Sequence, residues 1–393
     1  MKEGWRYEKL DDLGTIVTGA TPSTNDESNY FPKEYCFVKP SDLPLNGVGS
    51  IHETENYVSS KGLSVSRPLP AGSVLTTCIG TIGKVGLLLQ EGCTNQQINA
   101  VIPNNKINSR YLAYALLSIR KQLEFIANAP VVPIINKKSF SKIHIGYPPK
   151  PTQLSIVSEL DKLNELIRIK KEQLKDYDTL AQSIFYEMFG DPVENEKGWE
   201  VKKLGKLCSK IGSGATPRGG NESYKDEGIS LIRSLNVYNN EFRRKDLAYI
   251  DDEQAAALSN VTLLENDVLL NITGASVARC CIVPSDLLPA RVNQHVCIIR
   301  PLDNVLVPIF LNKVLTNISY QIRLLALARS KGATREALPK SVVDSLLVPL
   351  PPLPLQYSFA QKIEQIERQK AAIQKTITDL ETLLAARMQY WFD

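Results

Sequence analysis

Two polar triplets carry side chains that are well suited to recognising another molecule. Asn95-Gln96-Gln97 and Asn293-Gln294-His295 each stand just before an apolar run typical of a buried strand. A carboxamide presents a donor and an acceptor side by side, so Gln96 and Gln294 are able to pair with the edge of adenine in the major groove of DNA. Because the triplet occurs twice, it cannot by itself distinguish two different base sequences. The interpretation we favour is that these amides brace a nucleic-acid backbone.

Threonines and cations recur in the same way. Two Gly-Ala-Thr-Pro turns contain Thr21 and Thr216, whose hydroxyl groups and neighbouring amides suit a phosphate, although a purely structural turn is the interpretation we favour. A glycine turn that starts at Gly80 ends in Lys84, which Arg279 matches in the second half. The glycine spacing excludes a nucleotide-binding loop. This cation therefore either contacts a DNA backbone or is ordinary surface charge.

Sequence-specific contacts should come from the segments that differ between the two halves. Three pairs of segments differ, namely 23–34 and 218–227, 46–66 and 239–258, and 128–141 and 328–340. Lys39 and Arg233 adjoin these segments and are the stronger candidates for DNA contact. The remaining candidates within them are Lys137, Lys138, Arg218 and Thr334.

The composition of the chain limits which classes of function it can have. The chain has 393 residues, of which 43% are hydrophobic, and a net charge of only +4, so charge alone does not predict a polyanionic partner. The 7 cysteines and 3 histidines show no spacing typical of a zinc site or a disulfide framework. No catalytic set, S-adenosylmethionine fingerprint or helicase P-loop stands out. Without an apolar leader or a membrane span, the chain is expected to be cytoplasmic.

The elements that would position these residues follow from two long repeats. Segments 153–189 and 356–392 each follow a proline-rich lead and contain neither proline nor glycine. Each therefore predicts one helix on the order of 55 Å long. Apolar residues recur at steps of three and four from Leu160 to Met188 and from Ile363 to Trp391, with lapses at Lys170, Lys370 and Arg387. This seam predicts that the two helices pair antiparallel as a coiled coil.

The rest of the chain is duplicated as well. Gly4-Trp5 reappears as Gly198-Trp199, and the turns, strand-like runs and triplets follow in the same order. Short apolar runs rich in β-branched residues predict β-rich units, with helices over 111–122 and 308–325. The fold class is therefore α+β: two similar β-rich domains separated by two long antiparallel helices, with pseudo-twofold symmetry and adjacent termini.

These duplicated motifs resemble one known family, the specificity subunit of type I restriction-modification systems. The resemblance covers essentially the whole chain and includes the proline-rich leads into both helices and Phe189-Gly190-Asp191-Pro192 after the first. It implies a first target recognition domain over 1–150, a second over 191–353, and spacer helices over 151–190 and 354–393. The second half departs from the pattern at SVARC, after Gly274-Ala275, and at His295.

What the resemblance implies about function is specific. Each domain would read one half of a bipartite, asymmetric site in double-stranded DNA, while the helices set the spacer and dock two methyltransferase subunits. Restriction and translocase subunits would complete the complex. The chain itself would be non-catalytic and hold no cofactor, with S-adenosylmethionine, ATP and Mg²⁺ bound by its partners. The alternative is a duplicated coiled-coil scaffold that binds protein partners without reading DNA.

Overall fold

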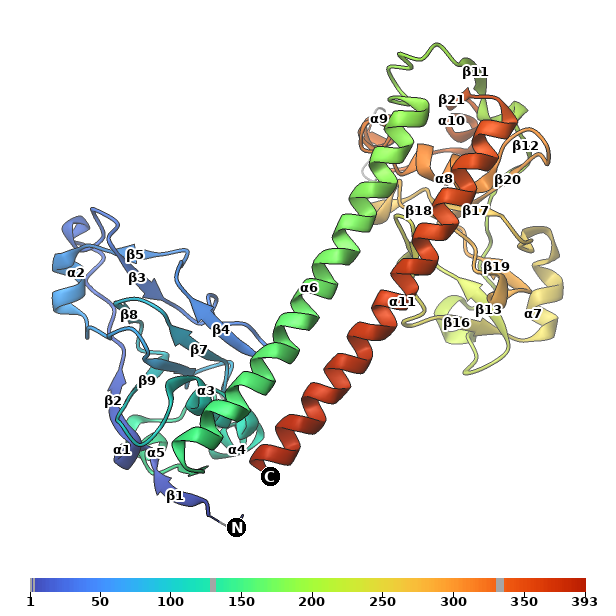
Figure 1. Ribbon diagram of the computed structural model, residues 1–393. Helices are drawn as coiled ribbons and strands as arrows, with labels where there is room; N and C mark the ends of the chain where they lie inside the picture. Colours follow the sequence, from blue (N-terminus) through green and yellow to red (C-terminus); the bar gives the residue numbers. More distant parts are fainter. Residues whose placement is uncertain (1, 3, 128–131, 330–335) are drawn as a thin grey trace. The chain divides into compact units, whose positions relative to one another are not determined.

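The computed structural model describes residues 2, 4–127, 132–329 and 336–393. The chain divides into two compact units. The first unit comprises Met1–Lys171 with Lys375–Asp393, and the second unit comprises Glu172–Gln374. Both boundaries fall inside long helices, α6 (Lys150–Phe189) and α11 (Leu353–Phe392), so each of these helices contributes one part to each unit (Figure 1).

The two long helices confirm the sequence prediction and begin three residues earlier than the proline-free segments. Pro151 lies in the first turn of α6 and Pro354 in the first turn of α11. A proline is tolerated there because the first amides of a helix have no partner within the helix. The proline-rich lead is therefore part of the helix start rather than a linker before it.

Ion pairs between the helices show that they run antiparallel. In the first unit Lys171 Nζ lies 2.7 Å from Glu381 Oε1, and Arg387 pairs with Glu159. In the second unit Lys370 Nζ lies 2.7 Å from Asp178 Oδ1. Two of the lapses in the predicted seam, Lys370 and Arg387, are thus ion pairs between α6 and α11. The bond from Arg387 also holds the pKa of Glu159 below its usual value.

The first unit is built on a five-stranded sheet in the order β2-β9-β6-β7-β4, with a three-stranded sheet β5-β3-β8 and a two-stranded sheet β1-β10. Strands β3 and β8 pair in parallel, and β2 pairs antiparallel with β9. The elements besides α6 are β1 (Arg6–Lys9), α1 (Leu10–Leu13), β2 (Gly14–Thr18), β3 (Tyr35–Val38), β4 (Val48–Ile51), β5 (Tyr57–Val58), α2 (Ser60–Val65), β6 (Val74–Thr77), β7 (Val85–Leu88), β8 (Gly92–Thr94), β9 (Ile98–Pro103), α3 (Ser109–Ser118), α4 (Arg120–Ile126), α5 (Lys137–Ser141) and β10 (His144–Tyr147).

The second unit repeats this order with local changes. Its sheets are β12-β20-β17-β18, β16-β13-β19, β11-β21 and β14-β15, and β13 again pairs in parallel with β19. The elements are β11 (Glu200–Lys203), β12 (Cys208–Ser213), β13 (Ile229–Ile232), β14 (Val237–Tyr238), β15 (Glu241–Phe242), β16 (Ala248–Ile250), α7 (Asp252–Ala257), β17 (Val268–Asn271), β18 (Cys280–Ile282), β19 (Ala290–Val292), β20 (Val296–Pro301), α8 (Pro308–Leu315), α9 (Ile318–Arg329), α10 (Lys340–Asp344) and β21 (Leu347–Leu350).

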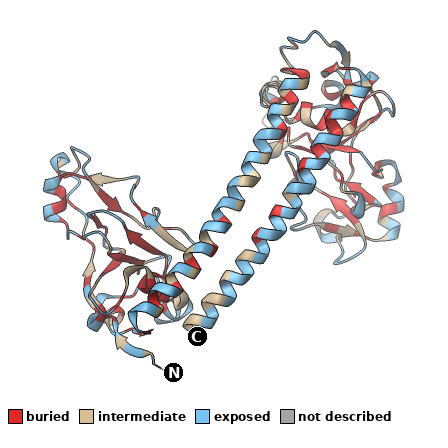
Figure 2. Ribbon diagram, viewed as in Figure 1, coloured by how far each residue is buried: buried red, intermediate tan, exposed pale blue. Residues whose placement is uncertain are grey.

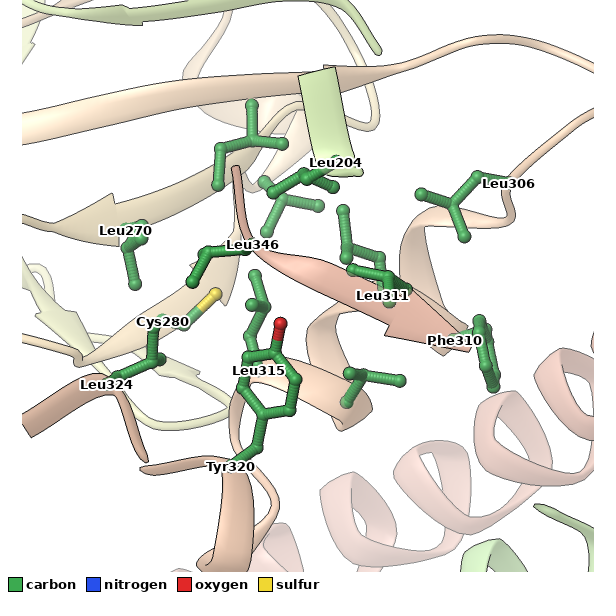
Figure 3. Packing of buried hydrophobic residues seen from close by; sticks show 14 of the residues in the cluster. Leu204, Leu270, Cys280, Leu306, Phe310, Leu311, Leu315, Tyr320, Leu324 and Leu346 are labelled. Carbon is green, nitrogen blue, oxygen red and sulfur yellow. The ribbon is translucent and has the colours of Figure 1, made fainter. Parts of the chain in front are cut away.

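Each unit has its own hydrophobic core, and the long helices take part in both. Buried residues lie in the strands and on one stripe of α6 and α11, while the remaining helix faces are exposed (Figure 2). In the second unit the strands pack against α8 and α9 through Leu270, Cys280, Leu311 and Tyr320 (Figure 3). Of the helices in the described part of the chain, none combines the length and the apolarity that crossing a bilayer requires.

Phe185 and Phe189, which the predicted seam did not include, also belong to this second core. Their side chains are 3% and 2% exposed. Phe189 lies 4.8 Å from Phe310 of α8 and 5.2 Å from Phe359 of α11, measured between ring centroids. At this end, therefore, α6 packs on α8 as well as on α11, and its apolar face is wider than a coiled-coil seam.

The shorter helices differ from the prediction. The segment 111–122 is two helices that meet at Ile119, and 308–325 is two helices separated by Thr316 and Asn317. In the second unit the Asn317 side chain accepts a hydrogen bond from the amide of Ser319, 3.0 Å away, at the start of α9. Asparagine is a strong N-terminal capping residue, so it ends one helix and begins another within a continuous apolar pattern.

Two buried glutamines join the long helices to the two units. Gln153 is fully buried; its Oε1 accepts from the Asn108 amide at 2.8 Å, and its Nε2 donates to the carbonyls of Pro148 and Lys106. Gln356 repeats this arrangement, with its Oε1 2.9 Å from the Val307 amide. Each glutamine fixes the start of a long helix to the loop that precedes α3 or α8.

Residues near the two ends of the chain lie close together, as predicted. The Lys2 ammonium group donates to the carbonyl of Tyr390, and the ring of Tyr111 lies 6.4 Å from Trp5 and 5.5 Å from Phe392. All of these residues belong to the first unit. The end of α11 is therefore part of the core of the first unit.

Candidate nucleic-acid interface

In the first unit the Gly-Ala-Thr-Pro turn and the Asn-Gln-Gln triplet form one structure. The Gly19 amide donates to the Ile98 carbonyl at 3.1 Å, and the Thr21 hydroxyl donates to Gln96 Oε1 at 2.7 Å. A Cβ atom on Gly19 would lie 2.1 Å from the Asn95 carbonyl oxygen, so only glycine fits there. The turn therefore sets the position of an exposed glutamine, and whether it also contacts a phosphate stays a prediction.

The second unit repeats this structure. The Gly214 amide donates to the Val296 carbonyl at 2.9 Å, and the Thr216 hydroxyl donates to Gln294 Oε1. A Cβ atom on Gly214 would lie 2.1 Å from the Val292 carbonyl oxygen. Gln96 and Gln294 are both exposed, so each unit presents one carboxamide to solvent at the same point of its fold.

In the first unit two predicted cations adjoin this carboxamide. The Asn95 amide donates to the carbonyl of Val38, which places the next residue, Lys39, beside the triplet. Lys39 Nζ donates to Asn56 Oδ1 at 2.9 Å, and Lys84 Nζ donates to the carbonyl of Pro40 at 2.8 Å. The structure therefore brings together Thr21, Lys39, Lys84 and Gln96.

In the second unit aromatic rings hold the corresponding cations. The Asn293 amide donates to the carbonyl of Ile232, which places Arg233 beside the triplet. The Arg233 guanidinium lies 5.4 Å from the ring centroid of Tyr224 and donates to the carbonyl of Asp246. Its Nε is buried and has no partner among the described residues.

Arg279, the counterpart of Lys84, stacks on a tyrosine that it shares with a second arginine. Its guanidinium lies 4.3 Å from the ring centroid of Tyr238, and that of Arg243 lies 3.6 Å from the same centroid. Cation–π contact restricts a guanidinium without neutralising it, so the charge remains able to attract a phosphate. The two units thus hold equivalent cations in different ways.

A third segment joins the same region of each unit. The Gly80 amide donates to the carbonyl of Pro133 at 3.0 Å, and the Gly274 amide donates to that of Glu336 at 2.9 Å. Two exposed lysines, Lys137 and Lys138, follow this segment at the start of α5.

Two further predicted site residues lie in loops. Arg218 is exposed, directly after the Thr216-Pro217 turn. Thr334 lies outside the described residues. That the predicted residues contact DNA stays a prediction.

The exposed groups of this region are suited to binding. Two thiols lie close to this region along the chain or through a backbone bond: Cys78, whose amide donates to the Gln97 carbonyl, and Cys297, in the strand after the second triplet. Burial raises the pKa of each thiol to about 12, so neither is a thiolate at neutral pH. The exposed groups are amides, hydroxyls and cations, which are the groups that contact phosphates and base edges.

Sequence reasoning missed several residues that hold these cations. Asn56 fixes Lys39, and Tyr224 and Tyr238 fix Arg233 and Arg279. All three lie in or directly beside the segments that differ between the halves. These residues hold the cations through contacts between distant parts of the chain, which the sequence does not reveal. A run such as Tyr238 to Arg244 shows only that aromatic and cationic residues are close in sequence.

Comparison with known proteins identifies the class to which this arrangement belongs. The model of the type I restriction modification DNA specificity domain matches the chain twice, over residues 2–176 and 196–382. These two matches include both triplets and most of both long helices, so the chain belongs to this family of DNA specificity proteins. The resemblance inferred from the sequence is confirmed.

Two of the similar proteins are specificity subunits from different organisms. The type I restriction enzyme MjaIX specificity subunit of Methanocaldococcus jannaschii is 24% identical over 412 residues, with 96% of this chain and 90% of that protein covered. The HindI specificity subunit of Haemophilus influenzae is 29% identical over 205 residues, with 51% and 40% covered.

Solved structures show the same fold. The type I restriction-modification S subunit from M. genitalium has a TM-score of 0.59 at 12% identity and covers 99% of this chain and 96% of its own. A chain from a structure on assembly and conformational transition of the type I R-M system has a TM-score of 0.62 at 18% identity, with 100% and 98% covered. The α+β architecture with a long helix lying against the C-terminal helix is therefore that of S subunits.

Proposed function

We propose that this protein reads a bipartite DNA site, with one half bound by each unit. The observation that carries the proposal is the duplicated arrangement of threonine, carboxamide and cation on equivalent elements, surrounded by segments that differ between the units. The shared residues suit the DNA backbone or a common base contact, and the differing segments suit unlike half-sites. That division of labour explains why the scaffold is duplicated while the loops are not.

The long helices would set the gap between the half-sites and dock two methyltransferase subunits, joined in the full complex by restriction and translocase subunits. Support comes from α6 and α11, which run through both units without interruption and keep exposed charges outside the buried stripe. In this proposal S-adenosylmethionine, ATP and Mg²⁺ are bound by the partners, and this chain supplies recognition alone. The twofold relation between the units stays a prediction.

Exchange of one recognition domain tests the proposal. Strand β11 pairs with β21, with Glu200 opposite Leu350, so a segment cut at these positions has both ends on paired strands. We expect that replacing residues 200–350 with the equivalent segment of a specificity subunit of different target changes only one half of the methylated sequence. Methylation mapping of genomic DNA from cells that express the chimaera with its partners measures this.

The matched control replaces the corresponding segment of the first unit, from Arg6 in β1 to Tyr147 in β10. These two residues lie opposite each other in the paired strands. It should change only the other half of the methylated sequence. If both chimaeras assemble and the methylated motif remains unchanged, the protein is a scaffold rather than a reader of sequence.

Contacts to phosphates predict a strong dependence on salt. Affinity of the assembled complex for its site should fall by a factor of about 10³ between about 50 and 200 mM salt, because each phosphate contact releases counterions.

Replacing either Lys137 or Lys138 by glutamine should weaken binding to all sequences and lower the slope of log affinity against log salt by about 1. Fluorescence anisotropy with labelled duplexes measures the slope, and Lys9→Gln, at an exposed position of β1 outside the long helices and the differing segments, is the control. A flat response of the unmodified protein would contradict direct phosphate contact.

A further inference from the structure

One exposed arginine of the second unit is held by two of its neighbours. Arg243 lies directly after β15, within a segment that differs between the units. Its Nε and Nη2 atoms donate to Glu241 Oε1 and Oε2, each at 3.0 Å. Its guanidinium also lies 3.6 Å from the ring centroid of Tyr238. The Arg243 side chain is nevertheless 48% exposed, so a restrained guanidinium is presented to solvent.

The backbone of Arg243 is joined to the candidate interface through one buried asparagine. The amide of Arg243 donates to the carbonyl of Asn236 at 2.8 Å, and the Asn236 side chain donates to the carbonyl of Arg243 at 2.9 Å. The same side chain accepts from the amide of Arg233, the cation beside the second triplet. Tyr238 in turn also holds Arg279. Arg243 therefore belongs to the region of the predicted cations, although it is not one of them.

The bonds to Glu241 determine which donors Arg243 has left. A guanidinium has a side edge, formed by Nε and Nη2, and an end edge, formed by Nη1 and Nη2. Glu241 occupies the side edge. The end edge retains two parallel N–H donors, which match either the O6 and N7 atoms of guanine or two oxygens of a phosphate. Among the bases, guanine presents two adjacent acceptors in the major groove.

The carboxylate of Glu241 favours guanine over phosphate. It already compensates the charge of Arg243, and it would repel a phosphate placed against the same guanidinium. The edge of guanine carries no net charge and avoids this repulsion. Arg279 is the contrasting case: its guanidinium lies 4.3 Å from the centroid of the same ring, and the described residues form no ion pair with it. Arg279 therefore remains suited to a phosphate.

We infer that Arg243 reads a guanine in the major groove of the half-site bound by the second unit, with Glu241 and Tyr238 as its positioning residues. The inference rests on the proposed function, because it names one base contact of one recognition unit. Segment 46–66, which corresponds to 239–258 in the first unit, contains no arginine. The contact thus belongs to one half-site alone, as expected of a residue that distinguishes two unlike half-sites.

Modified duplexes test the inference on the unmodified protein. The full-length chain, assembled with its methyltransferase subunits, is titrated with duplexes in which each guanine of the mapped site is replaced in turn by 7-deazaguanine. This base lacks the N7 acceptor but keeps O6 and its pairing with cytosine. We expect the replacement to lower affinity about tenfold at one guanine, in the half-site that the domain exchange assigns to the second unit. Hypoxanthine at that position keeps both acceptors and should leave affinity nearly unchanged.

A charge-balanced variant shows whether Arg243 makes this contact. Arg243→Gln with Glu241→Gln removes one charge of each sign, so the net charge near the DNA is unchanged. We expect this double variant to bind the mapped site about tenfold more weakly, with no further loss when 7-deazaguanine stands at the sensitive position. Glu241→Gln alone keeps the arginine but weakens its restraint, and it should lower discrimination at that position only.

The neighbouring ion pair supplies the matched control. Arg244 Nη2 donates to both carboxylate oxygens of Asp286, at 3.0 and 2.8 Å, and both side chains are exposed. This pair lies in the same part of the chain, but its arginine bonds through a single nitrogen and its guanidinium is not restrained along one edge. Arg244→Gln with Asp286→Asn should leave the response to 7-deazaguanine intact.

Each result has a distinct meaning. If no guanine of that half-site responds to 7-deazaguanine, or if the double variant still responds to it, the inference is wrong and the proposed function stands. A loss in the double variant that is equal for all sequences would mean that Arg243 contacts a phosphate, which also overturns the inference. Unchanged discrimination in Glu241→Gln would contradict the positioning role of Glu241. Failure of the domain exchange, in contrast, would overturn the proposed function itself.

Discussion

Replacing Asp267 by alanine should lower the free energy of unfolding of the second unit by about 3–5 kcal/mol. The Asp267 side chain is 0% exposed and forms two bonds with Arg300, of 2.7 and 2.8 Å. It also accepts from the Leu264 amide at 2.8 Å. Without the carboxylate, the Leu264 amide loses its partner, and the Arg300 guanidinium, 23% exposed, keeps its bond to the Thr262 carbonyl but loses its counter-charge. A charge left without compensation in a largely buried place is costly.

The first unit supplies the matched control for this prediction. Ser73 stands where Asp267 does, directly before the equivalent strand, and Ile102 stands where Arg300 does. The Ser73 hydroxyl donates to the carbonyl of Pro70, three residues earlier, at 2.7 Å. The double variant Asp267→Ser with Arg300→Ile should therefore recover most of the stability that Asp267→Ala loses, since replacing a buried ion pair by well-packed groups is often neutral.

Urea denaturation followed by tryptophan fluorescence measures both effects. Trp199 lies in the second unit, and Trp5 and Trp391 lie in the first, so a Trp5→Phe, Trp391→Phe background reports on the second unit alone. A loss below about 1 kcal/mol for Asp267→Ala, or a double variant as unstable as the single one, would show that the ion pair does not stabilise the unit.

The second large effect is expected at the buried glutamines. Gln153→Leu should destabilise the first unit by about 3 kcal/mol, because it leaves the Asn108 amide and the Pro148 and Lys106 carbonyls without partners. Gln356→Leu should do the same to the second unit, where the Val307 amide and the Pro351 carbonyl lose theirs. Thermal and urea unfolding of the two variants compare the losses directly.

The control for this prediction lies on the same helix. Gln361 is exposed on α11, and Gln361→Leu should change stability by less than about 0.5 kcal/mol. Equal effects of Gln361→Leu and Gln356→Leu would mean that lost helix propensity or surface polarity, rather than the buried bonds, explains the result.

The sequence predicted the features that depend on periodicity and duplication. Long segments without proline or glycine define α6 and α11, and the three-and-four spacing identified residues that are indeed buried, such as Leu160, Ile363 and Ile377. The order of the motifs also predicted which segments would be equivalent. These features are local patterns repeated over many residues, so tertiary contacts do not override them.

Features that depend on contacts between distant residues were not predictable. The helix breaks at Ile119 and after Thr316 occur within continuous apolar patterns. Phe185 and Phe189 were omitted from the seam because α8 is a third helix, whose position no spacing along α6 reveals. Glutamine is usually a surface residue. Gln153 is buried because it is hydrogen bonded to the loop before α3, a contact that the sequence does not show.

The candidate site was predictable in part. The sequence identified Thr21 and Gln96, and Thr216 and Gln294, as separate motifs, and the structure shows that each pair is hydrogen bonded. The bond requires the turn after β2 or β12 to approach the triplet before β9 or β20, which follows from strand pairing rather than from either motif. The side chains that hold Lys39, Arg233 and Arg279 come from segments that differ between the units or directly adjoin them.

The two charged residues within the apolar stripe of α11 also restrict how the helices can slip. Displacement of α11 by one heptad would move it about 10 Å along α6, which is the rise of about three base pairs. It would separate Lys370 from Asp178 and Arg387 from Glu159. A uniformly apolar stripe would tolerate several such registers, whereas this one has a single register that satisfies its charges. Under the proposed function, a gap in DNA set by these helices would therefore have one length.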